Sequence, residues 1–250
     1  MQSQNLSVAR NSLRHLVLGA SYGGGWTVGT SEPGVPPPQP GSVRQPHAMM
    51  IANNILKVAP AAKLFDLPLV PVKISNIQAF LSFADAYQRV FMDVARCRLG
   101  QFPGPWIIVN PWGIYDRSSE FPVGHYTENP NSPFNLLVAG ALAQNIDVVF
   151  AAGNCGQFCP DNRCGGRDRG LSRSIWGANS LESVLTVGAV RADGIWLGYS
   201  SLGPGQPGLR SNKPDLCATS QFCEDNDAFT INTGTSAACG LTAGVVAGLA

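Results

Sequence analysis

The chain has 250 residues, enough for one sizeable domain and too few to require two. Its residues are 44% hydrophobic and 13% charged, which predicts a globular protein with much of the chain buried. The net charge of +1 gives no electrostatic reason to expect a nucleic acid or an anionic membrane as partner. No apolar stretch is both long enough and free enough of polar residues to span a membrane, and the N-terminal residues lack a secretory signal pattern, so the compartment stays open.

Short aliphatic and β-branched runs bounded by Gly, Pro or Asn predict buried parallel strands. In chain order the expected strands are 16–20, 62–70, 105–110, 146–153 and 183–190, and the helical patterns between and beside them cover 47–58, 74–99 and 132–145. This alternation predicts an α/β fold with a mostly parallel central sheet and helices on both faces. In such sheets, binding sites lie beyond the carboxyl ends of the strands.

Two segments near the N-terminus have a clear local pattern. The Pro-rich stretch 30–46 cannot be a helix or a central strand, so it predicts a surface loop. In the helix 47–58, an apolar stripe is expected to face the core, with Asn53, Asn54 and Lys57 on the opposite face. The stripe consists of Ala48, Ile51, Ala52, Ile55 and Leu56.

The seven cysteines are an odd number, so at least one is unpaired within the chain. Cys155, Cys159 and Cys164 lie close together, but their spacing is not the paired C-x2-C pattern of a zinc site. A local disulfide and a set of reduced thiols both stay open. Three others lie in apolar surroundings and are expected to be small core residues: Cys97, Cys217 and Cys239.

The segment NTGTSAACG, residues 232–240, places Thr235 and Ser236 directly before an apolar run that continues to Ala250. One interpretation makes a hydroxyl residue the N-cap of a helix, where its oxygen accepts a first-turn backbone N–H. The other makes Ser236 a nucleophile at a helix N-terminus, where N–H groups favour developing negative charge. This window alone does not decide between them.

The chain has three histidines, and they differ in setting. His15 opens an expected strand and His125 lies in a polar loop, so both are interpreted as structural or solvated. His47 begins the first amphipathic helix directly after Pro46. A histidine there is either a solvated or capping residue or a general base.

The strand 146–153 ends in Ala151-Ala152-Gly153, three small residues that let another group approach the backbone closely. Asn154 follows where the strand stops. A Gly-Asn pair is ordinary in a turn, but an amide donor at this place can also stabilise an oxyanion beside a substrate cleft.

Five segments together resemble the subtilisin-like serine proteases in content and order. They are His47, AAGN at 151–154, YSSLGP at 199–204, KPDLCA at 213–218 and GTSAA at 234–238. The resemblance runs from about His47 to the end of the chain. It implies a serine-type endopeptidase in which Ser236 is the nucleophile, His47 the general base and Asn154 the side-chain donor of the oxyanion hole.

The resemblance also implies a polypeptide substrate in extended conformation, lying between Pro111-Trp112-Gly113 and Ala151-Ala152-Gly153. Trp112 then supplies apolar wall or packs in the core, and both alternatives stay open. No cofactor is implied. Members of the family often bind calcium, but no carboxylate-rich loop suggests a metal site here, since Asp225 and Asp227 are interpreted as part of a solvated loop.

The chain departs from the family pattern upstream of His47. The family has an Asp at a strand end that orients the histidine, but here no Asp precedes Asp66, and the only acid before His47 is Glu32. Either Gly19 in HLVLGAS stands in the Asp position, or the Asp strand lies upstream of Met1. The second account, together with the end of the chain at Ala250 within the apolar run after Ser236, predicts that 1–250 is a single peptidase domain truncated at both ends.

In subtilisin, loss of this Asp alone lowers turnover by about 3 × 10⁴, so the chain as given is expected to be a poor protease. The histidine motif also reads His-Ala-Met-Met in place of His-Gly-Thr-His. Loss of the glycine changes how closely another group can approach the backbone next to His47. The alternative function is a non-catalytic peptide-binding relative that keeps the cleft without the chemistry.

The segment GPGQPG, 203–208, matches the G-x-G-x-x-G pattern of dinucleotide-binding proteins. Its two prolines and polar surroundings do not fit the strand-to-helix turn that this pattern requires, so nucleotide binding is not expected.

Overall fold

The computed structural model describes residues 16–18, 46–66, 87–88, 90–92, 94, 102–206, 208–209, 212–224 and 227–250. Contacts divide the chain into two units, residues 1–104 and 105–250. Several expectations fall outside the described residues: the loop 30–45, the strand ends 19–20 and 67–70, most of the helix 74–99, and the residues His15, Glu32, Cys97 and Asp225. The expectation of a single domain stays a prediction.

In the first unit, strands β1 (Leu16–Leu18) and β2 (Leu64–Asp66) pair in parallel, and helix α2 (Pro46–Val58) precedes β2 in the chain. Ile51 and Ile55 of α2 are buried, as the apolar stripe predicted, whereas Ala48 of the same stripe is exposed. The prediction for Asn54 is wrong, because its side chain is fully buried. Asn54 follows Ile51 by three residues and therefore lies on the same face of the helix.

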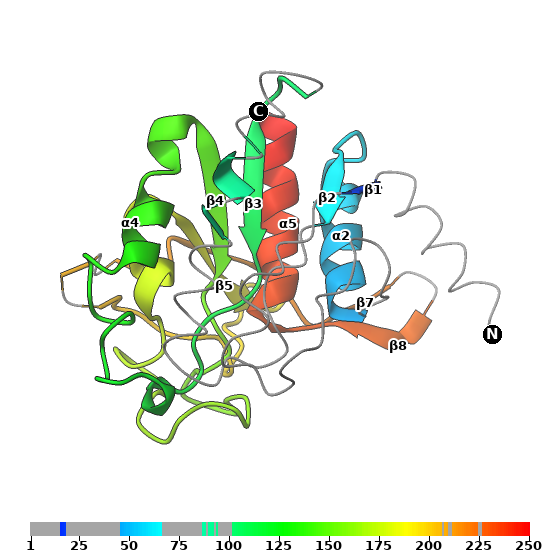
Figure 1. The fold of residues 1–250 in the computed structure, drawn as a ribbon. Coiled ribbons are helices and arrows are strands. Elements are labelled where there is room, and N and C mark those ends of the chain that lie inside the picture. Colours follow the sequence, from blue (N-terminus) through cyan, green and yellow to red (C-terminus); the bar gives the residue numbers. More distant parts are fainter. Residues whose placement is uncertain are drawn as a thin grey trace, which may run out of the picture. The chain divides into compact units, whose positions relative to one another are not determined.

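The second unit contains a four-stranded sheet in the order β3-β4-β5-β6, and every neighbouring pair is parallel (Figure 1). Its strands are β3 (Trp106–Asn110), β4 (Ile146–Ala151), β5 (Leu185–Val190) and β6 (Leu216–Thr219). The buried positions of the central strands β4 and β5 are mostly apolar, as continuous apolar runs predict for strands covered on both faces. The predicted α/β fold with a parallel sheet packed against helices is confirmed.

Helix α5 (Gly234–Leu249) contacts all four strands of this sheet. Its contact face is made of small residues, which let the helix axis approach the strands closely. Those residues are Ala237, Ala238, Cys239 and Ala243, each at most 1% exposed. No helix in the described part of the chain has the length and apolar character needed to cross a membrane.

The segment predicted as one helix over 132–145 forms two shorter elements, α4 (Pro133–Ala139) and the 3-10 turn η3 (Leu142–Gln144). The Ser132 hydroxyl caps α4 by accepting the backbone N–H of Asn135 at 3.2 Å. Gly140 ends α4, and Asn145 turns the chain into β4 with a left-handed φ of 53°. Glycine and asparagine are the residues that most readily allow such breaks.

Three strands were not anticipated: β6 at the sheet edge, and the antiparallel pair β7 (Phe222–Glu224) and β8 (Asp227–Asn232) that precedes α5. The position of β6 also corrects the expectation for Cys217, which is exposed. An edge strand has a neighbour on one side only, so an apolar sequence context does not ensure burial there. Cys239 is buried in α5, as expected.

Candidate active site

The chain turns sharply after β4, at the carboxyl edge of the sheet. Gly153 has a φ of 104°, which a residue with a side chain rarely adopts, and an added Cβ would lie 2.9 Å from the Ser201 hydroxyl. The backbone of Gly153 is held on both sides, because its N–H donates to the Thr235 hydroxyl at 3.1 Å and its carbonyl accepts the Ser201 N–H at 2.9 Å. The glycine therefore fixes the direction in which Asn154 leaves the strand.

The carboxamide of Asn154 bonds to the first turn of α5. Its Oδ1 accepts the backbone N–H of Thr235 at 2.9 Å and the Thr235 hydroxyl at 3.0 Å. Because a backbone N–H can only donate, this bond fixes which end of the carboxamide carries the oxygen. The other end of the carboxamide, Nδ2, donates to the Tyr115 hydroxyl at 3.5 Å.

The entry into α5 is held from a second direction. Gly234, the first helical residue, has a φ of 77° and donates its N–H to the Tyr199 hydroxyl at 3.2 Å. Tyr199 in turn donates to Ser220 Oγ at 3.0 Å, and Ser220 donates to the Gly234 carbonyl at 2.9 Å. Both the N–H and the carbonyl of Gly234 are thus hydrogen-bonded to other segments of the chain.

Ser236 is in the first turn of α5 and is 6% exposed. The N-cap of the helix is Thr233, so the interpretation of Thr235 or Ser236 as the N-cap is wrong. The Ser236 hydroxyl donates to the carbonyl of Pro111, beyond the end of β3, at 3.2 Å. The helix start carrying Ser236 and the segment following β3 are therefore in contact.

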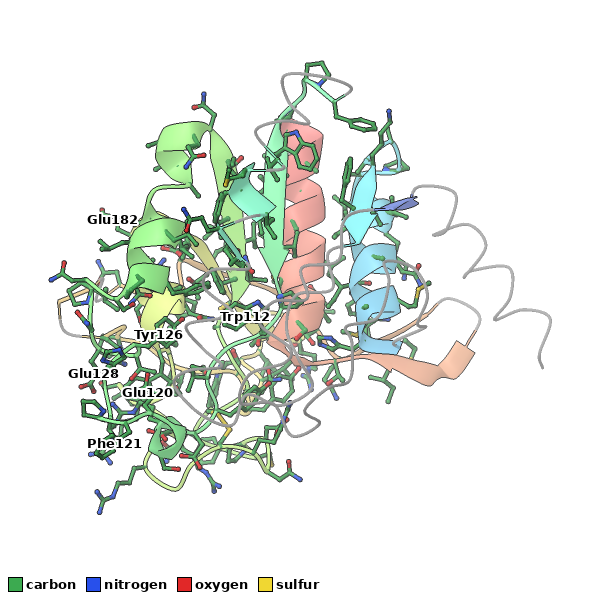
Figure 2. All side chains as sticks on the ribbon, viewed as in Figure 1. Trp112, Glu120, Phe121, Tyr126, Glu128 and Glu182 are labelled. Atoms are coloured by element: carbon green, nitrogen blue, oxygen red, sulfur yellow. A yellow bond between two sulfur atoms is a disulfide. The ribbon has the colours of Figure 1, made fainter. Side chains whose placement is uncertain are left out.

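Trp112, which directly follows Pro111, is half-buried and packs against aromatic rings of α4 and β4 (Figure 2). Its ring centroid is 5.4 Å from that of Phe150 and 5.8 Å from that of Phe134, and its indole N–H donates to Asn110 Oδ1 at 3.2 Å. The ring therefore contacts the buried residues Phe134 and Phe150, while its role as an apolar wall for the substrate stays a prediction.

A pocket opens beside Asn154, between the segments that follow β3 and β4. Gly113, Ala152 and Gly153, which the sequence assigned to substrate binding, are among its lining residues, while Ala151 and Trp112 are not. Asn179 joins the two walls, because its Nδ2 donates to the carbonyls of Ala151 at 2.7 Å and Trp112 at 3.2 Å.

A disulfide borders the same pocket. Cys155, directly after Asn154, is bonded to Cys164, and both are buried, whereas Cys159 between them is exposed and free. Of the alternatives left open by the sequence, the structure has the local disulfide. The loop is also tied back by the Asp161 N–H, which donates to the Asn154 carbonyl at 2.9 Å.

Tyr115 lines the pocket and contacts this loop through Arg163, whose guanidinium lies 4.1 Å from the centre of the tyrosine ring. Burial raises the pKa of the Tyr115 hydroxyl above its usual value, and the positive charge of Arg163 opposes that rise. The hydroxyl near Asn154 is therefore neutral around pH 7.

His47 is exposed, in the first turn of α2 in the first unit. Ser236, Asn154 and the pocket belong to the second unit. The structure thus brings Asn154 together with Thr235 and the start of α5, while the meeting of His47 with Ser236 stays a prediction.

Several residues of this site escaped the sequence analysis. Tyr199 and Ser201 belong to a motif that resembles the family but had no role predicted for them, and neither Ser220 nor Asn179 was predicted as a site residue. A polar residue next to a turn was the only signal available, because each of these side chains bonds to a segment far away in the sequence.

Comparison with known proteins identifies, over most of the chain, the same family that the sequence motifs resemble. The model of the subtilase family, Peptidase_S8, matches residues 49–250, so its match begins two residues after His47. No curated protein sequence matches the chain.

Two solved structures share the fold. The S41 psychrophilic protease is 17% identical, with a TM-score of 0.59 over 95% of this chain and 71% of that protein. Sphericase is 18% identical, with a TM-score of 0.60 over 96% of this chain and 71% of its own. On the match of the family model to most of its length, the chain belongs to the subtilase family.

Proposed function

We propose that this chain is a serine endopeptidase that cleaves extended polypeptides through an acyl-enzyme. Ser236 Oγ attacks the peptide carbonyl carbon while His47 takes the hydroxyl proton and returns it to the leaving amine. Water then attacks the ester, with His47 again as the base, and releases the acid product. During both steps the carbonyl oxygen becomes negative, and Asn154 Nδ2 with the Ser236 N–H stabilises it.

The hydrogen-bonded connection between Asn154 and Thr235 carries this proposal. It holds the Asn154 carboxamide against the helix turn that bears Ser236. The carboxamide oxygen is hydrogen-bonded to Thr235, and the N–H₂ group contacts the Tyr115 hydroxyl. Preorganised donors of this kind need no rearrangement when negative charge develops. The Ser236 hydroxyl donates to the carbonyl of Pro111 at 3.2 Å, so the segment that follows β3 lies beside the proposed nucleophile.

His47 is assigned as the base because the family resemblance begins with it and because its exposed position leaves the ring accessible. The assignment requires that the two units bring the imidazole to Ser236. A fluorophosphonate reagent, which bonds only to an activated serine, tests this requirement directly.

We expect the unchanged protein to be labelled and the label to map to Ser236 by peptide mass spectrometry. Ser236→Ala should abolish labelling, and His47→Ala should slow it about a thousandfold or more. Ser118→Ala is the matched control, because Ser118 is exposed and its hydroxyl makes no contact with the site. Labelling that is unaffected by His47→Ala would overturn the assignment of the base.

A non-catalytic peptide-binding protein is the second candidate. The observation that favours it is the absence of any Asp between residues 1 and 65, where the family has the residue that orients the histidine. Binding of peptides by a protein that fluorophosphonate does not label would support this second function.

A further inference from the structure

The pocket beside Asn154 is very small. Its cavity volume is about 10 Å³, which is room for about one water molecule. Glycines line part of it, Gly113 on one wall and Gly153 on the other, and walls made of such residues alone would leave a wide slot. The two largest residues of the lining are Tyr115 and Trp176, so we attribute the small volume to their rings.

The Trp176 ring is fixed in place. It is 3% exposed, and the guanidinium carbon of Arg117 lies 3.7 Å from the ring centre. Arg117 is in turn bonded to Asp168 at 2.9 Å and to Glu128. Movement of the ring away from the pocket would therefore disturb a stacked cation and its two ion pairs.

Tyr115 is held in a similar way. The guanidinium carbon of Arg163 lies 4.1 Å from the centre of the tyrosine ring, and Arg163 is bonded to Asp161 at 2.9 Å. The loop that carries Asp161 and Arg163 is closed by the disulfide between Cys155 and Cys164, and Cys155 also lines the pocket. The tyrosine ring is thus tied to a cross-linked loop at the edge of the pocket.

Two further lining residues are hydrogen-bonded to other segments. The Ser174 hydroxyl donates to the Gly170 carbonyl at 2.7 Å and accepts the Leu202 N–H at 3.0 Å. Asn179 bonds to both walls of the pocket, as described above. Since a well-packed interior yields little, a larger cavity would require several of these contacts to break together.

The pocket lies where the side chain before the cleaved bond would enter. In the proposed reaction, Asn154 Nδ2 binds the carbonyl oxygen of that substrate residue, and the Cα of the residue is only about 2.4 Å from this oxygen. Nδ2 also donates to the hydroxyl of Tyr115, a residue of the pocket. The substrate side chain therefore begins beside the pocket.

We propose that this pocket selects glycine or alanine before the cleaved bond and excludes branched, long and ring-bearing side chains. The inference rests on the proposed function, since it names the substrate class of the same site. A hydrogen atom or a methyl group needs little space, whereas a leucine or phenylalanine side chain would have to displace the fixed rings. Tyr115 and Trp176 are then the residues that determine specificity.

Peptide diphenyl phosphonates, used with the full chain, test the proposal. Ser236 Oγ attacks the phosphorus and phenoxide leaves, while the residue beside the phosphorus occupies the position before the cleaved bond. Four reagents are identical except for that residue, which is the analogue of glycine, alanine, leucine or phenylalanine. We expect the better of the glycine and alanine reagents to label Ser236 at least about tenfold faster than the other two. Equal or faster labelling by the leucine or phenylalanine reagent would overturn the inference.

Trp176→Ala removes the larger ring and should open the pocket. We expect the ratio of the phenylalanine rate to the glycine rate to rise at least about tenfold, and a general loss of stability does not change this ratio. Because Trp176 is buried, a second variant, Tyr115→Ala, removes a half-buried ring and should raise the same ratio.

Trp196→Ala is the matched control. Its ring packs against Phe158 outside the pocket, so the ratio should stay as in the unchanged protein. A ratio that does not rise in either pocket variant, or that rises equally in the control, would contradict the role of the two rings.

Failure of this inference is distinguishable from failure of the proposed function. Labelling of Ser236 by fluorophosphonate, together with equal labelling by all four peptide reagents, contradicts the inference alone. If fluorophosphonate does not label Ser236, the proposed function fails, and binding of fluorescent peptides that end in glycine or phenylalanine then tests the pocket. Equal or tighter binding of the phenylalanine peptide would overturn the inference as well.

Discussion

Asn154 caps helix α5 from 81 residues away, by accepting the backbone N–H of Thr235 at 2.9 Å. The bond to a first-turn N–H of the helix replaces the one that the N-cap residue Thr233 does not make. One carboxamide therefore stabilises the helix start with its oxygen and keeps its nitrogen for the proposed oxyanion hole.

Thr235→Val should weaken this connection. The Thr235 hydroxyl donates to Asn154 Oδ1 and accepts the Gly153 N–H, so valine removes both bonds while keeping the shape. We expect the rate of fluorophosphonate labelling to fall about tenfold and stability to fall by about 1–3 kcal/mol. Thr235→Ser keeps the hydroxyl and is the control; if serine and valine behave alike, the hydroxyl has no such role.

Gly234→Ala should disturb the same site from the backbone side. The φ of 77° strains any residue with a side chain, and the new Cβ would lie 3.1 Å from Asn154 Nδ2. We expect a loss of about 1–3 kcal/mol in urea unfolding together with slower labelling of Ser236. Gly248→Ala lies on the same helix, where a Cβ meets nothing, and should leave both quantities unchanged or slightly raise stability.

Reduction of the Cys155–Cys164 disulfide should destabilise the second unit. The bond closes a loop with a sequence separation of 9 residues, for which loop entropy predicts a loss of about 2.5 kcal/mol. Thermal unfolding with and without a reductant measures this, and Cys155→Ala with Cys164→Ala should reproduce the reduced value. Cys159→Ser changes an exposed free thiol in the same loop and should have no effect. An unchanged melting temperature on complete reduction would contradict the prediction.

Lys213→Met should be strongly destabilising, although lysine is normally a surface residue. The Lys213 side chain is fully buried, and its Nζ donates to the Val184 carbonyl at 2.8 Å and to Asp215 at 2.6 Å. Removal of the cation takes away the donor to the Val184 carbonyl and one of two donors to the partly exposed Asp215 carboxylate, which keeps the Thr186 N–H, so we expect a loss of about 2–3 kcal/mol in chemical denaturation. Arg191→Met breaks an exposed ion pair with Asp193 and should change stability little.

Local patterns in the sequence determined the central strands and indicated candidate residues of the site. The runs at 105–110 and 146–153 became β3 and β4 almost as predicted, because valine and isoleucine fit a sheet that is covered on both faces. The order of the AAGN and GTSAA segments indicated the subtilase family, since these residues need little context to be recognised.

The tertiary structure decided how those residues are held. The sequence did not show that Asn154 bonds to Thr235, that Tyr199 holds Gly234 or that Trp112 packs on Phe150. Each of these contacts joins segments separated by tens of residues, and only the folded sheet brings their ends to one edge. Helical and strand periods are local properties of a chain, whereas the partner of a hydrogen bond depends on which distant segment packs beside it.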